Sequence, residues 1–173
     1  MTDDTEEILH ALRSLVMPVC LVGAEFSSES SCATGTLSYV SLRPPMISTS
    51  LSRKSKTYEL AHQSKIFSIS LLRDDQVGTA MAAGSHGATS DKFAELELAT
   101  QRWRDVPALA DCDAVMWCSL EEECPVGEYV LCVGRVESVA VLPTGGRPLI
   151  RFDRRYRAMG DPVGDVDTST YPL

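Results

Sequence analysis

The sequence predicts a mainly β domain whose antiparallel strands close, fully or partly, into a barrel. Three observations lead there: several runs carry the alternating or β-branched pattern of strands, the helical segments between them are short, and no glycine-rich turn of the Rossmann or P-loop type occurs. Antiparallel strands with scattered short helices favour such a barrel. The 173 residues fit one domain, and 44% of them are hydrophobic, which is enough to form a core.

The chain is expected to open with a helix. Asp4 and Glu7 supply a cap and its capping-box partner, apolar residues follow at helical spacing, and Pro18 ends the helix. A short buried strand at 19–22 and a serine-rich polar loop at 25–31 are expected next.

The later elements are read from the same signals, namely alternation for strands and a capping residue before helical spacing for helices. In chain order we expect strands at 32–40 and 46–51, a helix capped by Ser55, a strand at 66–72, a helix at 76–83 capped by Asp74 and ended by Gly84, loop with a short helix at 85–111, and strands at 114–123, 128–142 and 148–152. The domain then covers 1–160, and 161–173 form a flexible acidic tail.

The formal net charge of -8 argues against a nucleic-acid partner, because phosphate binding needs a basic face. Much of the acidic charge lies at the two ends, so a local basic pocket in the middle is compatible with it. The first residues are acidic where a signal peptide is basic, and no apolar run reaches the roughly 20 residues that span a bilayer. We therefore expect a cytoplasmic protein that does not enter a membrane.

The six cysteines form no C-x-x-C pair, and most lie in apolar runs, as free buried thiols do. No histidine has ligand spacing to a cysteine, so no metal site is expected. The sequence shows no nucleophile triad. Of the three histidines, only His86, in a loop, is a candidate for a site.

Two segments carry polar groups where a ligand could bind. The hydroxyl-rich strand at 34–45 ends in paired prolines, and its hydroxyls indicate either a polar ligand or an edge strand that faces water. The junction at 50–57 combines serines, a threonine and three cations with a helix N-terminus, which is what a phosphate group needs. The alternative is that Ser55 only caps the helix and the cations are solvated. A third segment, 91–93, reads by itself as a solvated lysine and a core phenylalanine.

The order and spacing of these segments resemble the flavin reductase-like family, the small reductase partners of two-component flavin monooxygenases. That family has a strand of the form G-x-T-A-x-S-F-x-S-V-S-L-x-P-P, and residues 31–45 read S-C-A-T-G-T-L-S-Y-V-S-L-R-P-P. The resemblance covers about residues 10 to 159, and its other matching segments are 47–60, 67–72, 74–76, Asp91-Lys92-Phe93, 127–136, and 148–152 with Tyr156.

The resemblance implies an antiparallel, Greek-key split β-barrel that binds FMN or FAD and works as a homodimer. It implies that NADH or NADPH reduces the flavin and that a partner monooxygenase receives the reduced flavin. Hydride transfer is then the flavin's own chemistry, and no catalytic side chain is required. The flavin-binding residues that it implies are Thr34, Gly35, Thr36, Leu37, Ser38, Ser50, Leu51, Ser52, Lys54, Ser55, Thr57, Lys92 and Phe93, and the nicotinamide or substrate pocket would hold Tyr129, Tyr156 and His86.

Two positions depart from the family pattern. Ser31 and Ala33 stand where the family has glycine and threonine, which removes one hydroxyl near the expected ring. Tyr129 stands where the family has the histidine of a G-D-H motif. A tyrosine can still stack or donate a hydrogen bond, or it can mark a changed reaction. Two alternatives to a flavin reductase therefore stay open: an enzyme that keeps its flavin and oxidises or oxygenates a small organic substrate, and a flavin-binding protein without turnover.

Overall fold

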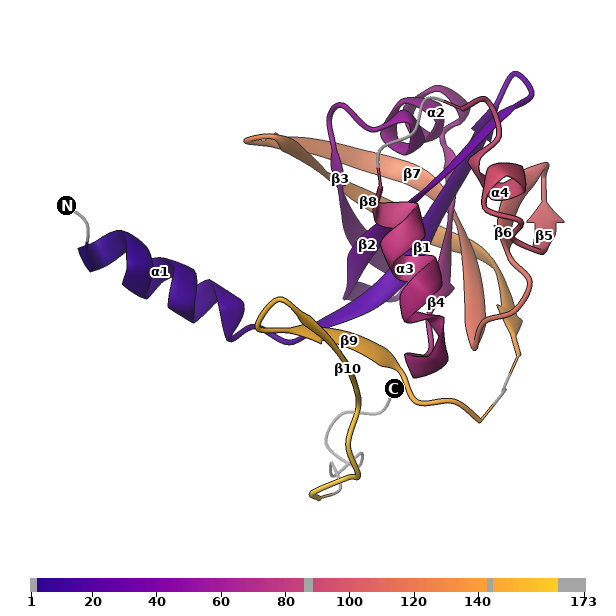
Figure 1. The fold of residues 1–173 in the computed structure, drawn as a ribbon. Coiled ribbons are helices and arrows are strands. Elements are labelled where there is room, and N and C mark those ends of the chain that lie inside the picture. The colour runs from indigo at the N-terminus through magenta and orange to yellow at the C-terminus, as the bar shows by residue number, and fades with distance from the viewer. Residues whose placement is uncertain (1–2, 86–88, 143–144, 165–173) are drawn as a thin grey trace.

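Six strands form a closed antiparallel barrel in a computed structural model that describes residues 3–85, 89–142 and 145–164. Around the barrel the order is β1 (Met17–Phe26), β2 (Glu29–Leu42), β3 (Pro45–Ser52), β8 (Tyr129–Val141), β7 (Ala114–Val126) and β4 (Ile66–Leu71). Because β1 pairs with both β2 and β4, the ring of strands is complete. The mainly β barrel predicted from the sequence is confirmed (Figure 1).

Short elements surround the barrel (Figure 1). A hairpin of β9 (Leu149–Phe152) and β10 (Arg155–Ala158) joins the start of β1, and β5 (Thr100–Trp103) pairs only with β6 (Val106–Leu109). The helices are α1 (Asp3–Arg13), α2 (Lys56–Ser64), the 3-10 turn η1 (Asp74–Gln76), α3 (Val77–Gly84) and α4 (Lys92–Glu95). In Figure 1, α1 projects away from the barrel, and within the described residues no helix is long and apolar enough to span a membrane.

The core has two layers that share β1. Cys20, Val22 and Ala24 point into the barrel, where they belong to a cluster that α2 completes with Leu60 and Ala61. Alternate residues of β1, such as Val19 and Leu21, pack outward against α3, α4 and the β5–β6 hairpin. Both faces of β1 are therefore buried at 19–24, which explains the apolar run in this part of the strand.

Several boundaries differ from the sequence prediction. The helix at the start ends at Arg13, because the chain at Met17 and Pro18 pairs as a strand with β9. The predicted polar loop at 25–31 is wrong: it is a tight hairpin in which Ser27 and Ser28 both have positive φ, as a two-residue turn of the I′ kind requires.

Further along the chain, a hairpin and a last strand were missed. The segment 85–111 contains β5 and β6, and β10 follows the predicted strand at 148–152. Asp74 does not cap α3; it begins η1, and Gln76 occupies the N-cap position. These strands are short and carry weak alternation, so only pairing with a neighbour identifies them. His86 and residues 165–173 of the predicted tail lie outside the described residues.

Candidate functional site

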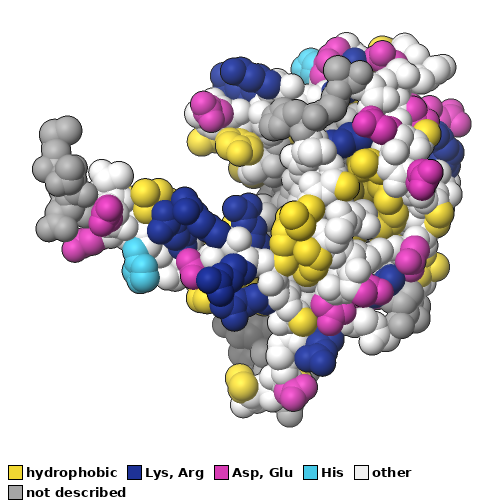
Figure 2. Space-filling view, in the orientation of Figure 1, with side chains coloured by type: hydrophobic (Ala, Val, Ile, Leu, Met, Phe, Trp, Pro, Cys, Tyr) yellow, Lys and Arg dark blue, Asp and Glu magenta, His cyan; other side chains and the backbone are white. Residues whose placement is uncertain are grey.

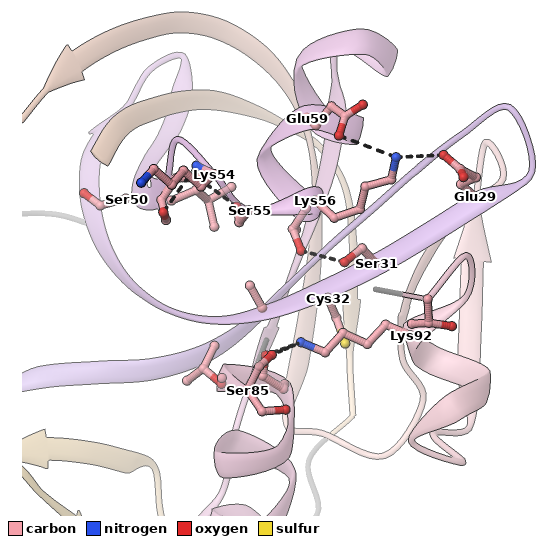
Figure 3. Close-up of a pocket in the computed structure, with 18 of the residues that line it drawn as sticks. Glu29, Ser31, Cys32, Ser50, Lys54, Ser55, Lys56, Glu59, Ser85 and Lys92 are labelled. Atoms are coloured by element: carbon pink, nitrogen blue, oxygen red, sulfur yellow. Dashed lines mark hydrogen bonds and ion pairs between the residues drawn. The ribbon is translucent and has the colours of Figure 1, made fainter. Parts of the chain in front are cut away.

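A cavity of about 610 Å³ opens between β2, β3, the first turn of α2 and the end of α3 (Figure 3). Its wall is rich in hydroxyl groups and contains three lysines. The lining residues are Glu29, Ser31, Cys32, Ala33, Thr34, Ser50, Leu51, Ser52, Lys54, Ser55, Lys56, Thr57, Glu59, Ala83, Gly84, Ser85, Thr89, Ser90, Lys92 and Tyr129.

The first turn of α2 presents hydrogen-bond donors to this cavity. Ser55 is the N-cap: its Oγ accepts from the Tyr58 backbone N–H at 3.1 Å and donates to the Ser52 carbonyl at 2.9 Å. The first N–H groups of a helix have no partner inside the helix and carry the positive end of its dipole. Lys54, beside them, has no carboxylate partner in the described part of the chain. This turn is therefore suited to hold an anionic group.

Lys56 does not contribute a free charge to the turn. Its Nζ lies 2.8 Å from Glu29 Oε2 and 3.5 Å from Glu59 Oε2, and the hydrogen bond to Glu29 raises the pKa of Lys56. Of the three cations that the sequence places in this segment, at least this one is already paired. The prediction of a basic anion site here thus depends on Lys54 and on the helix N-terminus.

Lys92 forms a second positive group, on the other side of β2 (Figure 3). It is only 7% exposed, and its Nζ donates to the carbonyls of Ala83 and Ser85, both at 2.7 Å, at the end of α3. The sequence reading of a solvated lysine is wrong. A buried ammonium with carbonyl partners leaves one N–H and a net charge that favour a negative group in the cavity.

Hydrogen bonds fix α4, which carries Lys92, and join it and α3 to β2. Asp91 caps α4 by accepting from the Ala94 N–H at 3.0 Å and accepts from Ser30 Oγ at 2.7 Å. Thr34 Oγ1 donates to the Ala80 carbonyl and so joins β2 to α3. Cys32, between the two, is not a nucleophile, because burial raises the pKa of its thiol to about 12.

Many of the sequence-predicted residues meet at this cavity, and others do not. The residues that line it are Thr34, Ser50, Leu51, Ser52, Lys54, Ser55, Thr57, Lys92 and Tyr129. Gly35 is buried behind the wall, where an added Cβ would lie 2.9 Å from Val22 Cγ2. Phe93 packs in the outer core layer.

The remaining predicted residues lie elsewhere in this chain. Thr36, Leu37 and Ser38 continue along β2, past the part of the strand that lines the cavity. Tyr156 packs against the core near Leu149 and is not a lining residue. His86 falls outside the described residues.

The sequence reading missed the end of α3. Ala83, Gly84 and Ser85 line the cavity because α3 packs on β2, and Gly84 lies next to Thr34. Small residues at a helix end carry no signal of a site by themselves. The one available signal was Lys92, whose charge needs carbonyl or anionic partners when it is buried.

The donor set fits a flavin phosphate ester. Hydroxyl and backbone donors, an unpaired lysine at a helix N-terminus and a second, buried lysine surround a cavity of suitable size. Across the described residues, no three His, Cys, Asp or Glu side chains gather as a metal site. The hydroxyl, backbone and lysine donors of the wall suit the cavity to an organic anion.

Comparisons with known proteins agree with this geometry. The chain is 31% identical over 155 residues to the reductase component of 4-hydroxyphenylacetate 3-monooxygenase from Thermus thermophilus. The aligned region covers 89% of this chain and 96% of that protein. It is 30% identical over 131 residues to the actinorhodin polyketide dimerase of Streptomyces coelicolor, covering 76% of this chain and 72% of that one.

A solved structure and a family model extend the comparison. The styrene monooxygenase flavin reductase of Pseudomonas putida has the same fold, with a TM-score of 0.78 and 22% identity over 90% of this chain and 99% of that chain. The model of the flavin reductase like domain matches residues 12–160, which contain the whole barrel and every described lining residue of the cavity. Because the family model and the Thermus relative both match most of the length of this chain, the chain belongs to the flavin reductase-like family.

Proposed function

We propose that this protein is an NAD(P)H:flavin oxidoreductase that reduces FMN or FAD and supplies the reduced flavin to a partner monooxygenase. The observation that carries the proposal is the cavity with Lys54 at the N-terminus of α2, which pairs with no carboxylate among the described residues, inside a domain of the flavin reductase-like family. A relative from Streptomyces nodosus is named an NADH-dependent FMN reductase and one from Rhodococcus an NADH-dependent flavin reductase, which supports NADH as the reductant.

In this proposal the side chains of the cavity bind and orient the flavin, and none of them performs an acid–base step. Ser55, Lys54 and the first N–H groups of α2 hold the flavin phosphate, and Ser50 and Ser52 support the polar chain beside it. Lys92 would supply a buried positive charge in the cavity wall, which would favour negative charge on a bound flavin. Accepting hydride from the nicotinamide is chemistry that the flavin supplies when it is bound.

Further parts of the proposal concern the oligomeric state, the partner protein and the cellular location. A homodimer is supported by apolar side chains left exposed on α1, such as Ile8 at 59% and Leu12 at 55%. A monooxygenase partner is supported by the relative that is itself named the reductase component of a monooxygenase. The cytoplasm is the proposed location, because NADH is supplied there.

The test is oxidation of NADH and NADPH by purified protein, with and without added FMN or FAD and with no other substrate. Oxidation that depends on added flavin is the expected result, and the same assay ranks the two flavins and the two nicotinamides. Flavin binding without oxidation of either nicotinamide would contradict the proposal.

A second function is favoured by Tyr129 and by the polyketide dimerase among the relatives. In that case the flavin stays bound and an organic substrate is oxidised or oxygenated. This alternative predicts that flavin copurifies with the protein through gel filtration, whereas a reductase that releases its product loses the flavin.

A further inference from the structure

Glu29, Lys56 and Glu59 form a charged triad in the cavity wall (Figure 3). The two carboxylates share one ammonium, at 2.8 Å and 3.5 Å, so the triad carries a net charge of about -1 at neutral pH. The side chains of Glu29 and Glu59 are 46% and 53% exposed, so they stand at the mouth of the cavity.

The triad lies beside the proposed phosphate site without belonging to it. Figure 3 shows Lys54 and Ser55 on one side of the start of α2, and Glu29 with Glu59 on the other. A single phosphate at Lys54 and Ser55 meets a lysine without a carboxylate partner and helix N–H groups. A ligand that continues past that phosphate toward the β1–β2 hairpin meets carboxylates.

The wall below the triad is closed. Ser31 Oγ and Thr57 Oγ1 lie 3.0 Å apart in a hydrogen bond between β2 and α2, and the two residues are 4% and 1% exposed. A ligand that extends from the phosphate site toward the β1–β2 hairpin therefore passes over the two carboxylates.

We propose that this triad makes the protein select the flavin mononucleotide FMN over the dinucleotide FAD. FMN ends at one phosphate, whereas FAD carries a second phosphate and adenosine. The second phosphate would lie beside a net negative triad, and like charges a few ångströms apart repel. Rejecting one ligand through a repulsive contact is a common way to obtain specificity. The inference rests on the proposed function, because it needs a flavin phosphate at α2.

The test is the affinity of FMN, FAD and riboflavin for the wild type and for Glu29→Gln, measured by quenching of flavin fluorescence. We expect the wild type to bind FMN at least about tenfold more tightly than FAD. Glu29→Gln should tighten FAD about fivefold and change FMN less than twofold, because the amide removes one of the two negative charges and leaves the triad neutral. Added salt should narrow the wild-type difference, because it screens exposed charges.

The matched control is Glu25→Gln. Glu25 lies in the same hairpin and pairs with Arg102 at 2.6 Å, but it does not line the cavity. This variant should keep the wild-type ratio of affinities. An equal shift in Glu25→Gln would reveal a general charge effect and overturn the role of the triad.

Two other outcomes separate this inference from the proposed function. If NADH oxidation depends on flavin but FMN and FAD bind equally to the wild type, or respond equally to Glu29→Gln, the selectivity is overturned and the reductase stands. If no flavin binds to any variant while thermal melting shows all of them folded, the proposed function and the inference fall together.

Discussion

Tyr129 brings an aromatic ring and a hydroxyl to the open side of the cavity. It is the first residue of β8, pairs with Ser52 of β3 and is 53% exposed. The family pattern has a histidine at this position, which the resemblance links to the nicotinamide. A half-exposed ring in the cavity wall can stack against an aromatic ligand, and its hydroxyl can donate a hydrogen bond.

We expect Tyr129→His to raise the rate of NADH oxidation at saturating FMN, because it restores the family's side chain at the mouth of the cavity. Steady-state measurement of kcat and KM for NADH checks this. Tyr39→His, which changes an exposed tyrosine outside the cavity, is the control. Equal rates in the wild type and Tyr129→His would leave Tyr129 as a structural residue of the wall.

Gly134 in β8 allows the largest fully buried side chain, Phe67, to cross the barrel interior. A Cβ at residue 134 would lie 2.5 Å from Phe67 Cζ and 2.9 Å from Cys118 Cβ. Gly134→Ala should therefore lower the free energy of unfolding by about 1–3 kcal/mol, the usual cost of overpacking a core. Urea denaturation measures it. Gly78→Ala, where an added Cβ meets nothing within 4 Å, should cost nothing.

At the scale of elements, the turn into α2 has two separable roles, helix capping and anion binding. Replacing Lys54 and Ser55 together by alanine should weaken FMN binding by about 1–3 kcal/mol, the scale of charge-assisted hydrogen bonds. Riboflavin, which lacks the phosphate, should bind as before. Isothermal titration calorimetry with FMN and with riboflavin shows whether the variant loses affinity only for the ligand that carries a phosphate.

The control for this turn is Arg53→Ala, which removes a neighbouring cation that does not line the cavity. Loss of the Ser55 cap should also lower stability by about 1 kcal/mol, with or without ligand. Unchanged FMN affinity in the double variant would rule out phosphate binding at this turn.

The helix α4 depends on an ionised Asp91. The Ala94 backbone N–H, and then the Ser30 hydroxyl, hold the pKa of Asp91 below its ordinary value of 3.8. Because the folded-state pKa is depressed, the stabilisation is complete above the unfolded pKa and is lost as the pH falls through the folded one.

Asp91→Asn keeps a capping side chain and removes the charge. We expect the variant to be less stable than the wild type by roughly 1 kcal/mol at pH 6, and the difference to shrink as the pH falls below 3.8 and through the lower folded-state pKa. Urea midpoints across this pH range provide the measurement. Glu95→Gln, an exposed change in the same helix, should leave the dependence of the urea midpoint on pH unchanged.

At the scale of the whole molecule, α1 is an amphipathic helix whose apolar side the described residues leave about half exposed. Ile8, Leu9 and Leu12 share that side and are 59%, 41% and 55% exposed. Such a face needs a partner surface, and the proposed homodimer supplies one. Figure 2 shows apolar side chains along α1 and further apolar patches on the barrel.

We expect Leu12→Glu to convert a dimer into a monomer, because it places a charge in the apolar face. Sedimentation velocity gives the mass directly. His10→Glu introduces a carboxylate on the opposite side of the same helix and should leave the dimer intact. A wild type that sediments as a monomer at micromolar concentration would contradict the dimer.

The sequence by itself determined the fold class, the order of most elements and the cap of α2. Ser55 could be identified because capping is local: the side chain bonds to an N–H three residues away. The unbroken apolar run of β1 and the alternation of β3 are local signals as well. The family resemblance came from the same strands, whose spacing is preserved along the chain.

Only the tertiary structure decided how charge is distributed in the cavity. Lys92 is buried because α3 ends against it, and Lys56 is neutralised because the β1–β2 hairpin brings Glu29 across to α2. Both contacts join residues whose proximity depends on pairing between strands and on packing of helices onto the barrel. Since no local pattern records such long-range contacts, the sequence could suggest an anion site but could not tell which of its lysines remain free.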